Sequence, residues 1–167
     1  MDKTSGFTNH YLSPLGAVTL ASDGYALTGL WFDGQKHFAA GLSGGTSEKD
    51  LPVFDTAKRW LDIYFKGSAP DFIPPLNLCG SGFRRAVWDI LLTVPFGQTR
   101  TYGQIAAQLS GRMSARAVGN AVGRNPVALI VPCHRVIGAN GKLTGYAGGV
   151  DRKIKLLELE KADFFKK

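Results

Sequence analysis

A proline-rich break near the middle of the chain constrains the fold more than any other feature of the sequence. Residues 67–75 include three prolines, and proline lacks a backbone N–H and disfavours the α conformation in the residue before it. A helix cannot continue through this segment. We therefore expect it to be an interdomain connection between a first domain at residues 1–79 and a second domain at residues 80–167.

The two predicted domains differ in charge. Residues 1–79 hold six Lys and Arg against eight Asp and Glu, whereas residues 80–167 hold fourteen against five. The chain's net charge of +7 is therefore the sum of −2 in the first domain and +9 in the second. This asymmetry favours a polyanion partner, because each phosphate that Lys or Arg neutralises releases condensed counterions. A merely basic surface is the alternative.

Cysteine content indicates a reducing compartment, and hydropathy indicates a protein that does not cross a membrane. Cys79 and Cys133 are the only cysteines of the sequence, and a chain with a full-sized core does not need a disulfide, so we expect free thiols. Residues 1–20 lack a charged segment followed by an apolar run, and no later stretch is apolar for long enough to cross a bilayer. We expect a cytoplasmic protein without membrane association.

The first domain is expected to be a small α/β unit. Two β-prone runs at residues 15–21 and 25–32 flank Asp23-Gly24, a pair that favours a tight hairpin turn. After a Gly/Ser-rich loop at residues 41–47, Asp55 is expected to cap a helix that covers the sheet. The inward face of this helix is predicted to contain Trp60, Leu61, Tyr64 and Phe65.

The second domain is expected to contain a helix-turn-helix. Thr101 and Gln104 have the spacing of a capping box at the start of a helix over residues 102–109. A turn at residues 110–113 follows, and Ser114 can cap another short helix that runs through residue 122. Before them, Ser81 is the predicted cap of an amphipathic helix with an inward face of Phe83, Val87, Ile90 and Leu91.

Two further elements are predicted towards the end of the chain. Asn140-Gly141 favours a hairpin turn between residues 136–137 and 142–143, which would form a small wing. A last helix begins at about Asp151 and places Glu158 and Glu160 on different faces, so that one carboxylate could reach a site. Its inward side chains are expected to be Ile154, Leu156, Leu157 and Leu159.

Cys133 is the candidate nucleophile. It is followed by His134 and Arg135, and a neighbouring positive charge is expected to lower the pKa of the thiol. Adjacent side chains rarely touch, so we expect His134 to accept the thiol proton through a water molecule. Glu160 or Glu158 would accept the other imidazole N–H. The alternative is a buried cysteine that serves only as a small apolar side chain.

Other thiol chemistry receives less support from the sequence. The two cysteines and three histidines show no spacing typical of a metal site, so we expect neither a metal nor another cofactor. A cysteine hydrolase would need an oxyanion hole and a deacylating water. The spacing neither indicates nor excludes these, and a hydrolase stays a distant alternative.

The run Pro132-Cys133-His134-Arg135-Val136 resembles the signature of the O6-alkylguanine-DNA alkyltransferases, also called methylated-DNA–protein-cysteine methyltransferases. The resemblance covers residues 82 to about 161, and residues 13–16 and 29–32 match less distinctively. It implies an RNase H-like fold for the first domain and a winged helix-turn-helix for the second. The other matching motifs are Phe83-x-x-x-Val87-Trp88, Pro95-Phe96-Gly97, Thr101-Tyr102, Ala115-Arg116-Ala117-Val118-Gly119, Asn125-Pro126, Gly145-Tyr146-Ala147-Gly148-Gly149 and the segment from Lys153 to Glu160.

The resemblance implies a single-use repair protein. It would bind double-stranded DNA at the minor groove, flip O6-alkylguanine out of the stack and transfer the alkyl group to Cys133. We expect O4-alkylthymine to be repaired as well, by a monomer, with cooperative binding along DNA left open. The thioether product has no electrophilic carbonyl for water to attack, so the thiol is not regenerated. An alkyltransferase-like protein that senses lesions without chemistry is the alternative, but such proteins lack the acceptor cysteine.

The resemblance also implies roles for individual residues. His134 is the water-mediated base, Glu160 orients it, and Asn125 shapes the active-site turn. Arg116 replaces the flipped base in the stack, and Tyr102 helps to rotate the nucleotide and donates a proton to the departing guanine. A phosphate contact and an ordinary aromatic at a helix start are the respective alternatives. The expected DNA contacts are Arg116, Tyr102, Ala117, Ser114, Gly119 and Arg124, and the expected base pocket is Val131, Tyr146, Ala147 and Gly148.

Two positions depart from the family pattern. Ala147 stands where some members have serine, and Val122 stands where others have a bulkier side chain. The range of alkyl groups that the site accepts is therefore open. The sequence contains no additional cysteine-rich module of the kind found in regulatory members, so we expect repair without regulation of transcription.

Overall fold

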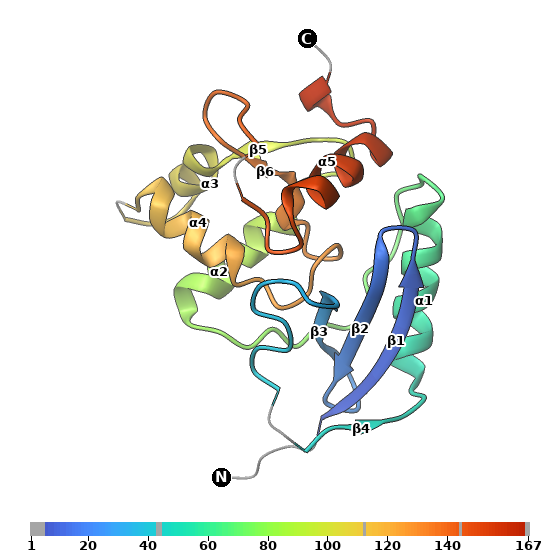
Figure 1. Ribbon diagram of the computed structural model, residues 1–167. Helices are drawn as coiled ribbons and strands as arrows, with labels where there is room; N and C mark the ends of the chain where they lie inside the picture. Colours follow the sequence, from blue (N-terminus) through green and yellow to red (C-terminus); the bar gives the residue numbers. More distant parts are fainter. Residues whose placement is uncertain (1–5, 43–44, 112, 144, 166–167) are drawn as a thin grey trace. The chain divides into compact units, whose positions relative to one another are not determined.

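The structure, a computed structural model, describes residues 6–42, 45–111, 113–143 and 145–165 (Figure 1). Contacts between residues group the chain into two compact units. Unit 1 contains the residues up to Cys79 together with Pro126–Ala128, and unit 2 contains the rest. A tripeptide from the second half of the sequence thus belongs to unit 1. Arg112, in the predicted turn at 110–113, lies outside the described residues.

A four-stranded sheet forms the centre of unit 1. Its order is β3-β2-β1-β4, and only the short β4 pairs in parallel. The predicted hairpin is confirmed as β2 and β3, whereas β1 and β4 were not predicted. In β1, Leu12 is exposed and Asn9 and Ser13 are buried, so the strand lacks the apolar alternation that would reveal it. The strands are β1 (Phe7–Ser13), β2 (Gly16–Ser22), β3 (Leu27–Phe32) and β4 (Ser47–Glu48).

Two segments from distant parts of the sequence cover the outer edge of β3. Leu27 donates its N–H to the carbonyl of Pro75 at 2.8 Å and accepts from the N–H of Asn77 at 2.8 Å. Leu30 bonds in the same way to Pro126 at 2.8 Å and to Ala128 at 2.9 Å. The end of the predicted connection, at Pro75, thus satisfies a backbone group of the strand edge, as do Asn77, Pro126 and Ala128.

Helix α1 (Pro52–Phe65) packs on β1 and β2 (Figure 1). The predicted cap is wrong: Leu51 is the N-cap residue, and Asp55 lies in the first turn. Proline fits the first helical position because its missing N–H would have no intrahelical partner there. The carboxylate of Asp55 instead interacts favourably with the positive end of the helix dipole. Of the predicted face, Trp60, Leu61 and Tyr64 are buried and Phe65 is half-buried.

Unit 2 is mostly helical, and its helix starts agree with the predicted caps. Ser81 accepts from the N–H of Arg84, Ser114 accepts from the N–H of Ala117, and Thr101 forms the capping box with Gln104. No helix in the described parts of the chain is long and apolar enough to cross a membrane. The elements are α2 (Gly82–Leu91), β5 (Arg100–Thr101), α3 (Tyr102–Gln108), α4 (Ala115–Gly123), η1 (Cys133–Arg135), β6 (Val136–Ile137), α5 (Val150–Leu159) and η2 (Asp163–Phe165).

The predicted wing is formed differently from a simple hairpin. Strand β6 pairs in parallel with β5, and not with residues 142–143. The loop closes through bonds from the N–H of Gly138 to the carbonyl of Lys142 at 2.8 Å and from the N–H of Gly141 to the carbonyl of Gly138 at 3.0 Å. The turn therefore spans four residues, with Gly141 at its positive-φ position. The wing is thus joined to β5, the strand that leads directly into α3.

Helices α2, α3 and α4 form the helix-turn-helix core. The indole of Trp88, which is 1% exposed, donates from Nε1 to the carbonyl of Ala121 at 2.9 Å and so links α2 to α4. Gly119 of α4 lies against Tyr102 of α3, where an added Cβ would be 3.6 Å from two ring carbons. The small residues of α4 thus allow close packing within the protein.

Replacing Trp88 with phenylalanine tests the link between α2 and α4. Trp88→Phe retains an aromatic ring but removes the indole donor, so we expect the free energy of unfolding to fall by about 1–3 kcal/mol. Urea denaturation measures the change. The matched control is Trp60→Phe in α1, where the tryptophan ring stacks on Tyr64. Equal losses in the two variants would show that the hydrogen bond contributes nothing beyond ring size.

Candidate active site

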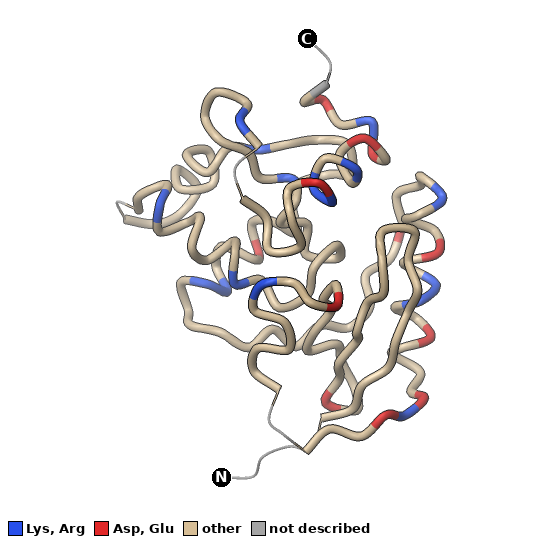
Figure 2. The backbone as a smooth tube through the Cα atoms, in the orientation of Figure 1, with Lys and Arg blue, Asp and Glu red and all other residues tan. Residues whose placement is uncertain are grey.

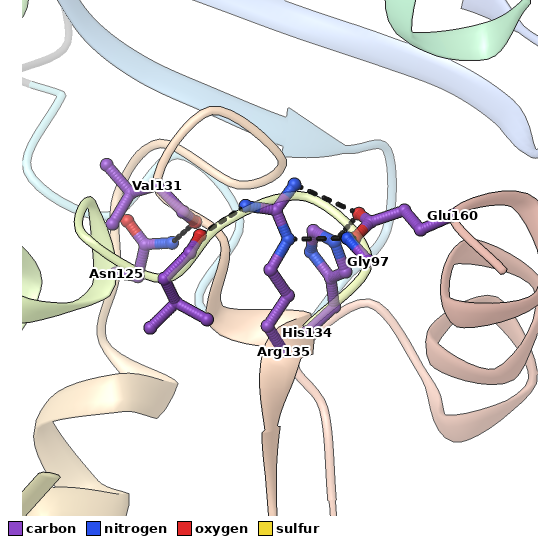
Figure 3. A network of polar contacts seen from close by, with 7 residues as sticks. Gly97, Asn125, Val131, His134, Arg135 and Glu160 are labelled. Carbon is purple, nitrogen blue, oxygen red and sulfur yellow. Dashed lines mark hydrogen bonds and ion pairs between the residues drawn. The ribbon is translucent and has the colours of Figure 1, made fainter. Parts of the chain in front are cut away.

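Cys133 opens the short helix η1 and is 6% exposed. Its N–H donates to the carbonyl of Val131 at 2.8 Å. Nδ2 of Asn125 donates to the same carbonyl at 2.7 Å (Figure 3). Leu129, which lies between Asn125 and Val131 in the sequence, is buried and has a φ of +70°. This is a strained conformation for a side chain branched at Cγ. Asn125 therefore closes the turn that leads to the cysteine.

Four donors converge on the buried carboxylate of Glu160 (Figure 3). Nε2 of His134 lies 2.6 Å from its Oε2, and the N–H of Gly97 donates to Oε1 at 3.0 Å. Arg135 donates from Nε to Oε1 at 2.9 Å and from Nη2 to Oε2 at 3.2 Å, while its Nη1 donates to the carbonyl of Val94 at 2.7 Å. Of the two carboxylates that the sequence left open, Glu160 holds the imidazole and Glu158 is exposed.

Gly97 is required for one of these contacts. Its φ is +82°, and an added Cβ would lie 3.3 Å from the carbonyl oxygen of Glu160. Another residue would be strained there and would press on the end of α5. The Pro95-Phe96-Gly97 motif thus delivers a backbone donor to the buried carboxylate.

The network fixes the protonation states of its members. Burial alone would raise the pKa of Glu160, but the bond from His134 and the ion pair with Arg135 bring that pKa far below its ordinary range. Burial lowers the pKa of His134 against the opposing effect of Glu160, so the imidazole is neutral at pH 7. Because a carboxylate only accepts, the neutral ring carries its hydrogen on Nε2, and Nδ1 becomes the basic nitrogen.

The expectation of a lowered thiol pKa at Cys133 is wrong. Burial raises this pKa, and the opposing effects of Asn125, Lys153 and Tyr146 do not compensate for it. The predicted cations do not help, because His134 is neutral and Arg135 is directed at Glu160. Cys133 is therefore a protonated thiol at rest, and it needs a base in order to react.

Lys153 is a charged neighbour of Cys133 that the sequence reasoning missed. It belongs to α5, is only 1% exposed, and interacts electrostatically with the thiol. Burial lowers its pKa to about 8, and a negative charge on Cys133 would oppose this. Its spacing from Leu156 and Leu157, three and four residues further on, places it on the buried face of the helix. That spacing was the available signal.

Tyr146 approaches the thiol from the predicted base pocket. Its hydroxyl is buried, and its ring meets the ring of His134 edge-on with centroids 6.5 Å apart. Burial and then the nearby Cys133 raise the pKa of Tyr146 well above its ordinary value, so the phenol keeps its proton. Val131 and Gly148 are buried, and Ala147 is half-buried.

The residues predicted to contact DNA form a second group around α4. Ser114 caps this helix, Arg116 is exposed in its first turn, and Arg124 is exposed at its C-cap. Ala117 and Gly119 are half-buried on the same helix. Figure 2 shows Lys and Arg along α4 and at the start of α2, whereas the two signs alternate along α1. Tyr102 joins this group through its packing on Gly119.

The side chains of the described residues do not assemble a metal site. No group of three or more His, Cys, Asp or Glu residues lies close enough to hold an ion within the described ranges. Cys133 is a free thiol, and so is Cys79, which is exposed. The residues around Cys133 thus combine a buried, protonated thiol with an adjacent neutral imidazole whose orientation Glu160 fixes.

The fold and the site together define a helix-turn-helix protein with a buried nucleophilic thiol. Residues 8–78 match the family described as 6-O-methylguanine DNA methyltransferase, ribonuclease-like domain, and residues 82–162 match its DNA binding domain. The chain belongs to the 6-O-methylguanine DNA methyltransferase family. The family resemblance and the fold class predicted from the sequence are thereby confirmed.

Named relatives match over nearly the whole chain. The methylated-DNA–protein-cysteine methyltransferase of Mycobacterium leprae is 49% identical over 149 residues, which cover 89% of this chain and 88% of the relative. The protein of the same name from Methanosarcina acetivorans is 46% identical over 149 residues, covering 89% and 94%. The crystal structure of Mycobacterium tuberculosis OGT in complex with DNA matches with a TM-score of 0.82 and 47% identity, covering 94% of this chain and 92% of that one.

Removing the charge of Glu160 tests the network through stability. In Glu160→Gln, Arg135 becomes a buried cation without a carboxylate, so we expect the free energy of unfolding at pH 7 to fall by about 3–5 kcal/mol. Because folding lowers the pKa of Glu160 from 4.5, its contribution is complete above that pH. It is lost progressively as the pH falls towards the folded-state pKa.

Urea denaturation between pH 7 and pH 3 measures both effects. The variant should show a weaker loss of stability than the wild type below about pH 4.5, because it lacks the group that titrates there. Glu158→Gln on the exposed side of α5 is the matched control. If the two variants had the same stability at pH 7, the proposed role of the carboxylate as the centre of the network would be wrong.

Proposed function

We propose that this protein repairs O6-alkylguanine in double-stranded DNA by transferring the alkyl group once, irreversibly, to Cys133. The observation that carries the proposal is the buried thiol beside a neutral His134 whose orientation Glu160 fixes at 2.6 Å. Membership of the 6-O-methylguanine DNA methyltransferase family supplies the substrate class. A relative of 47% identity has been crystallised in complex with DNA, which supports DNA as the partner.

The reaction is an in-line displacement at the alkyl carbon. The thiol proton passes through a water molecule to Nδ1 of His134, and the sulfur of Cys133 forms a bond to the carbon as its bond to O6 breaks. The guanine leaves with the electron pair and takes up a proton, for which we propose Tyr102 as donor. Return of the proton from His134 to Tyr102 through solvent restores both residues, so the net products are unmodified guanine and a thioether. No cofactor is needed, because the thiol itself is the acceptor.

The surrounding residues would bind and shape the substrate. Arg116 occupies the space of the flipped nucleotide, and the other predicted DNA contacts of α4 hold the duplex. Asn125 sets the turn before Cys133, and the base enters beside Val131 and the loop at residues 145–149. O4-alkylthymine presents a similar alkyl oxygen and is proposed as a second substrate. A reactive free thiol and a DNA substrate both suit the cytoplasm, where we place the protein as a monomer.

The proposal predicts a stoichiometric adduct on Cys133. After incubation with duplex DNA containing O6-methylguanine, mass spectrometry should find one methyl group on the tryptic peptide that contains Cys133, and repair should stop at one equivalent. Cys133→Ser is the matched control and should remain unmodified. A lesion sensor would acquire no adduct at Cys133, and a thiol hydrolase would turn over repeatedly on an ester or amide. Either result would refute the transferase assignment.

Arg116→Ala distinguishes insertion into the base stack from a phosphate contact. If Arg116 replaces the flipped base, the variant should repair duplex DNA more slowly but react normally with the free alkylguanine base. The dependence of DNA affinity on salt should then stay close to the wild-type slope, because a lost phosphate contact would change that slope by about 0.9.

Exposed Lys66 of unit 1 supplies the control for the loss of one positive charge. Lys66→Ala should leave duplex repair and the salt slope unchanged. Equal losses of Arg116→Ala with duplex DNA and with the free base would contradict a role in flipping.

A further inference from the structure

Helix α5 holds the loop at residues 145–149 from one side. The N–H of Gly149 donates to the carbonyl of Tyr146 at 2.8 Å, and the N–H of Lys153 donates to the carbonyl of Gly149 at 3.1 Å. Arg152 adds a side-chain contact, because its Nη1 donates to the carbonyl of Gly148 at 3.0 Å. Gly148 is buried. A charged donor thus fixes a buried carbonyl in the middle of the loop.

The same loop forms a wall beside the reacting thiol. Tyr146 brings its buried hydroxyl next to Cys133, and its ring stands at 80° to the ring of His134. The carbonyl of Tyr146 accepts from the N–H of Gly149, so Tyr146 and Gly148 belong to one hydrogen-bonded turn. A displacement of the Gly148 carbonyl therefore changes the space next to the sulfur.

We infer that Arg152 is a specificity-determining positioning residue, which sets the room between the loop and Cys133 and thereby the size of the alkyl group that is transferred. The inference rests on the function proposed above. Methyl transfer requires the substrate to be held with its carbon in contact with the sulfur, and a fixed wall provides this. A benzyl group needs additional volume, which the same wall restricts.

Removing the side chain of Arg152 is expected to affect methyl transfer and benzyl transfer differently. Without its guanidinium, the carbonyl of the buried Gly148 lacks a charged donor, and we expect the loop to shift as this carbonyl takes another partner. The shift loosens the methyl pocket and enlarges it. Transfer of a methyl group should therefore slow, while transfer of a benzyl group should slow less or accelerate.

The experiment compares two lesions in one duplex sequence. Single-turnover rate constants for O6-methylguanine and O6-benzylguanine would be measured with wild type, Arg152→Met, Arg152→Lys and Lys155→Met. Arg152→Met keeps an aliphatic stem without a donor, and we expect it to raise the benzyl-to-methyl rate ratio by about tenfold or more. Arg152→Lys retains one charged donor and should restore part of the wild-type ratio. Lys155 is exposed on the same helix, and its variant should leave the ratio unchanged.

The rate ratio separates positioning from other roles of an arginine. A contact with a DNA phosphate, or simple destabilisation of the fold, would slow both lesions by the same factor, and that result would overturn the inference. An unchanged pair of rates in Arg152→Met would overturn it as well. If Arg152→Met did not fold in a thermal unfolding assay, Arg152→Lys would still report the ratio. Failure of the proposed function is distinguishable, because the wild type would then transfer neither group.

Discussion

The organisation of unit 2 depends on the buried carboxylate of Glu160. It joins three segments that are distant in sequence: the turn at Gly97, helix η1 through His134 and Arg135, and the end of α5. A buried ion pair contributes little net stability, because desolvation offsets its attraction. Its main effect is therefore geometric. With four donors around it, the carboxylate defines a single orientation of the imidazole and a single position of η1 against α5.

The surroundings of Cys133 keep the resting thiol protonated and also contain groups that favour its thiolate. Burial raises the pKa of Cys133, so the resting thiol is protonated and poorly reactive towards oxidants, which attack the thiolate. Three neighbouring side chains nevertheless favour the thiolate, since Asn125, Lys153 and Tyr146 each oppose the rise of this pKa. The thiolate therefore forms only when a base accepts the proton.

Much of the fold and the candidate site could be predicted from local sequence signals. The helix starts at Ser81, Thr101 and Ser114 follow from side-chain oxygens that cap backbone N–H groups within three residues. The pairing of His134 with Glu160 could be narrowed to two carboxylates by helical periodicity, but only tertiary packing chose between them. Strand β1 and the raised pKa of Cys133 could not be predicted, since both depend on burial by distant segments. Lys153 was missed because lysine is usually exposed, although its spacing placed it on the apolar face of α5.

The turn before the cysteine contains a strained residue, Leu129. Pro126–Ala128 is bonded to the edge of β3, and the chain then passes through Leu129 at a φ of +70° before it reaches Val131. A leucine in this conformation is disfavoured by about 1–3 kcal/mol and persists only where its surroundings determine it. The pairing with β3 fixes the chain on one side of Leu129, and the bond from Asn125 to Val131 fixes it on the other. The positive φ of Leu129 is therefore held by backbone bonds on both sides, at Pro126–Ala128 before it and at Val131 after it.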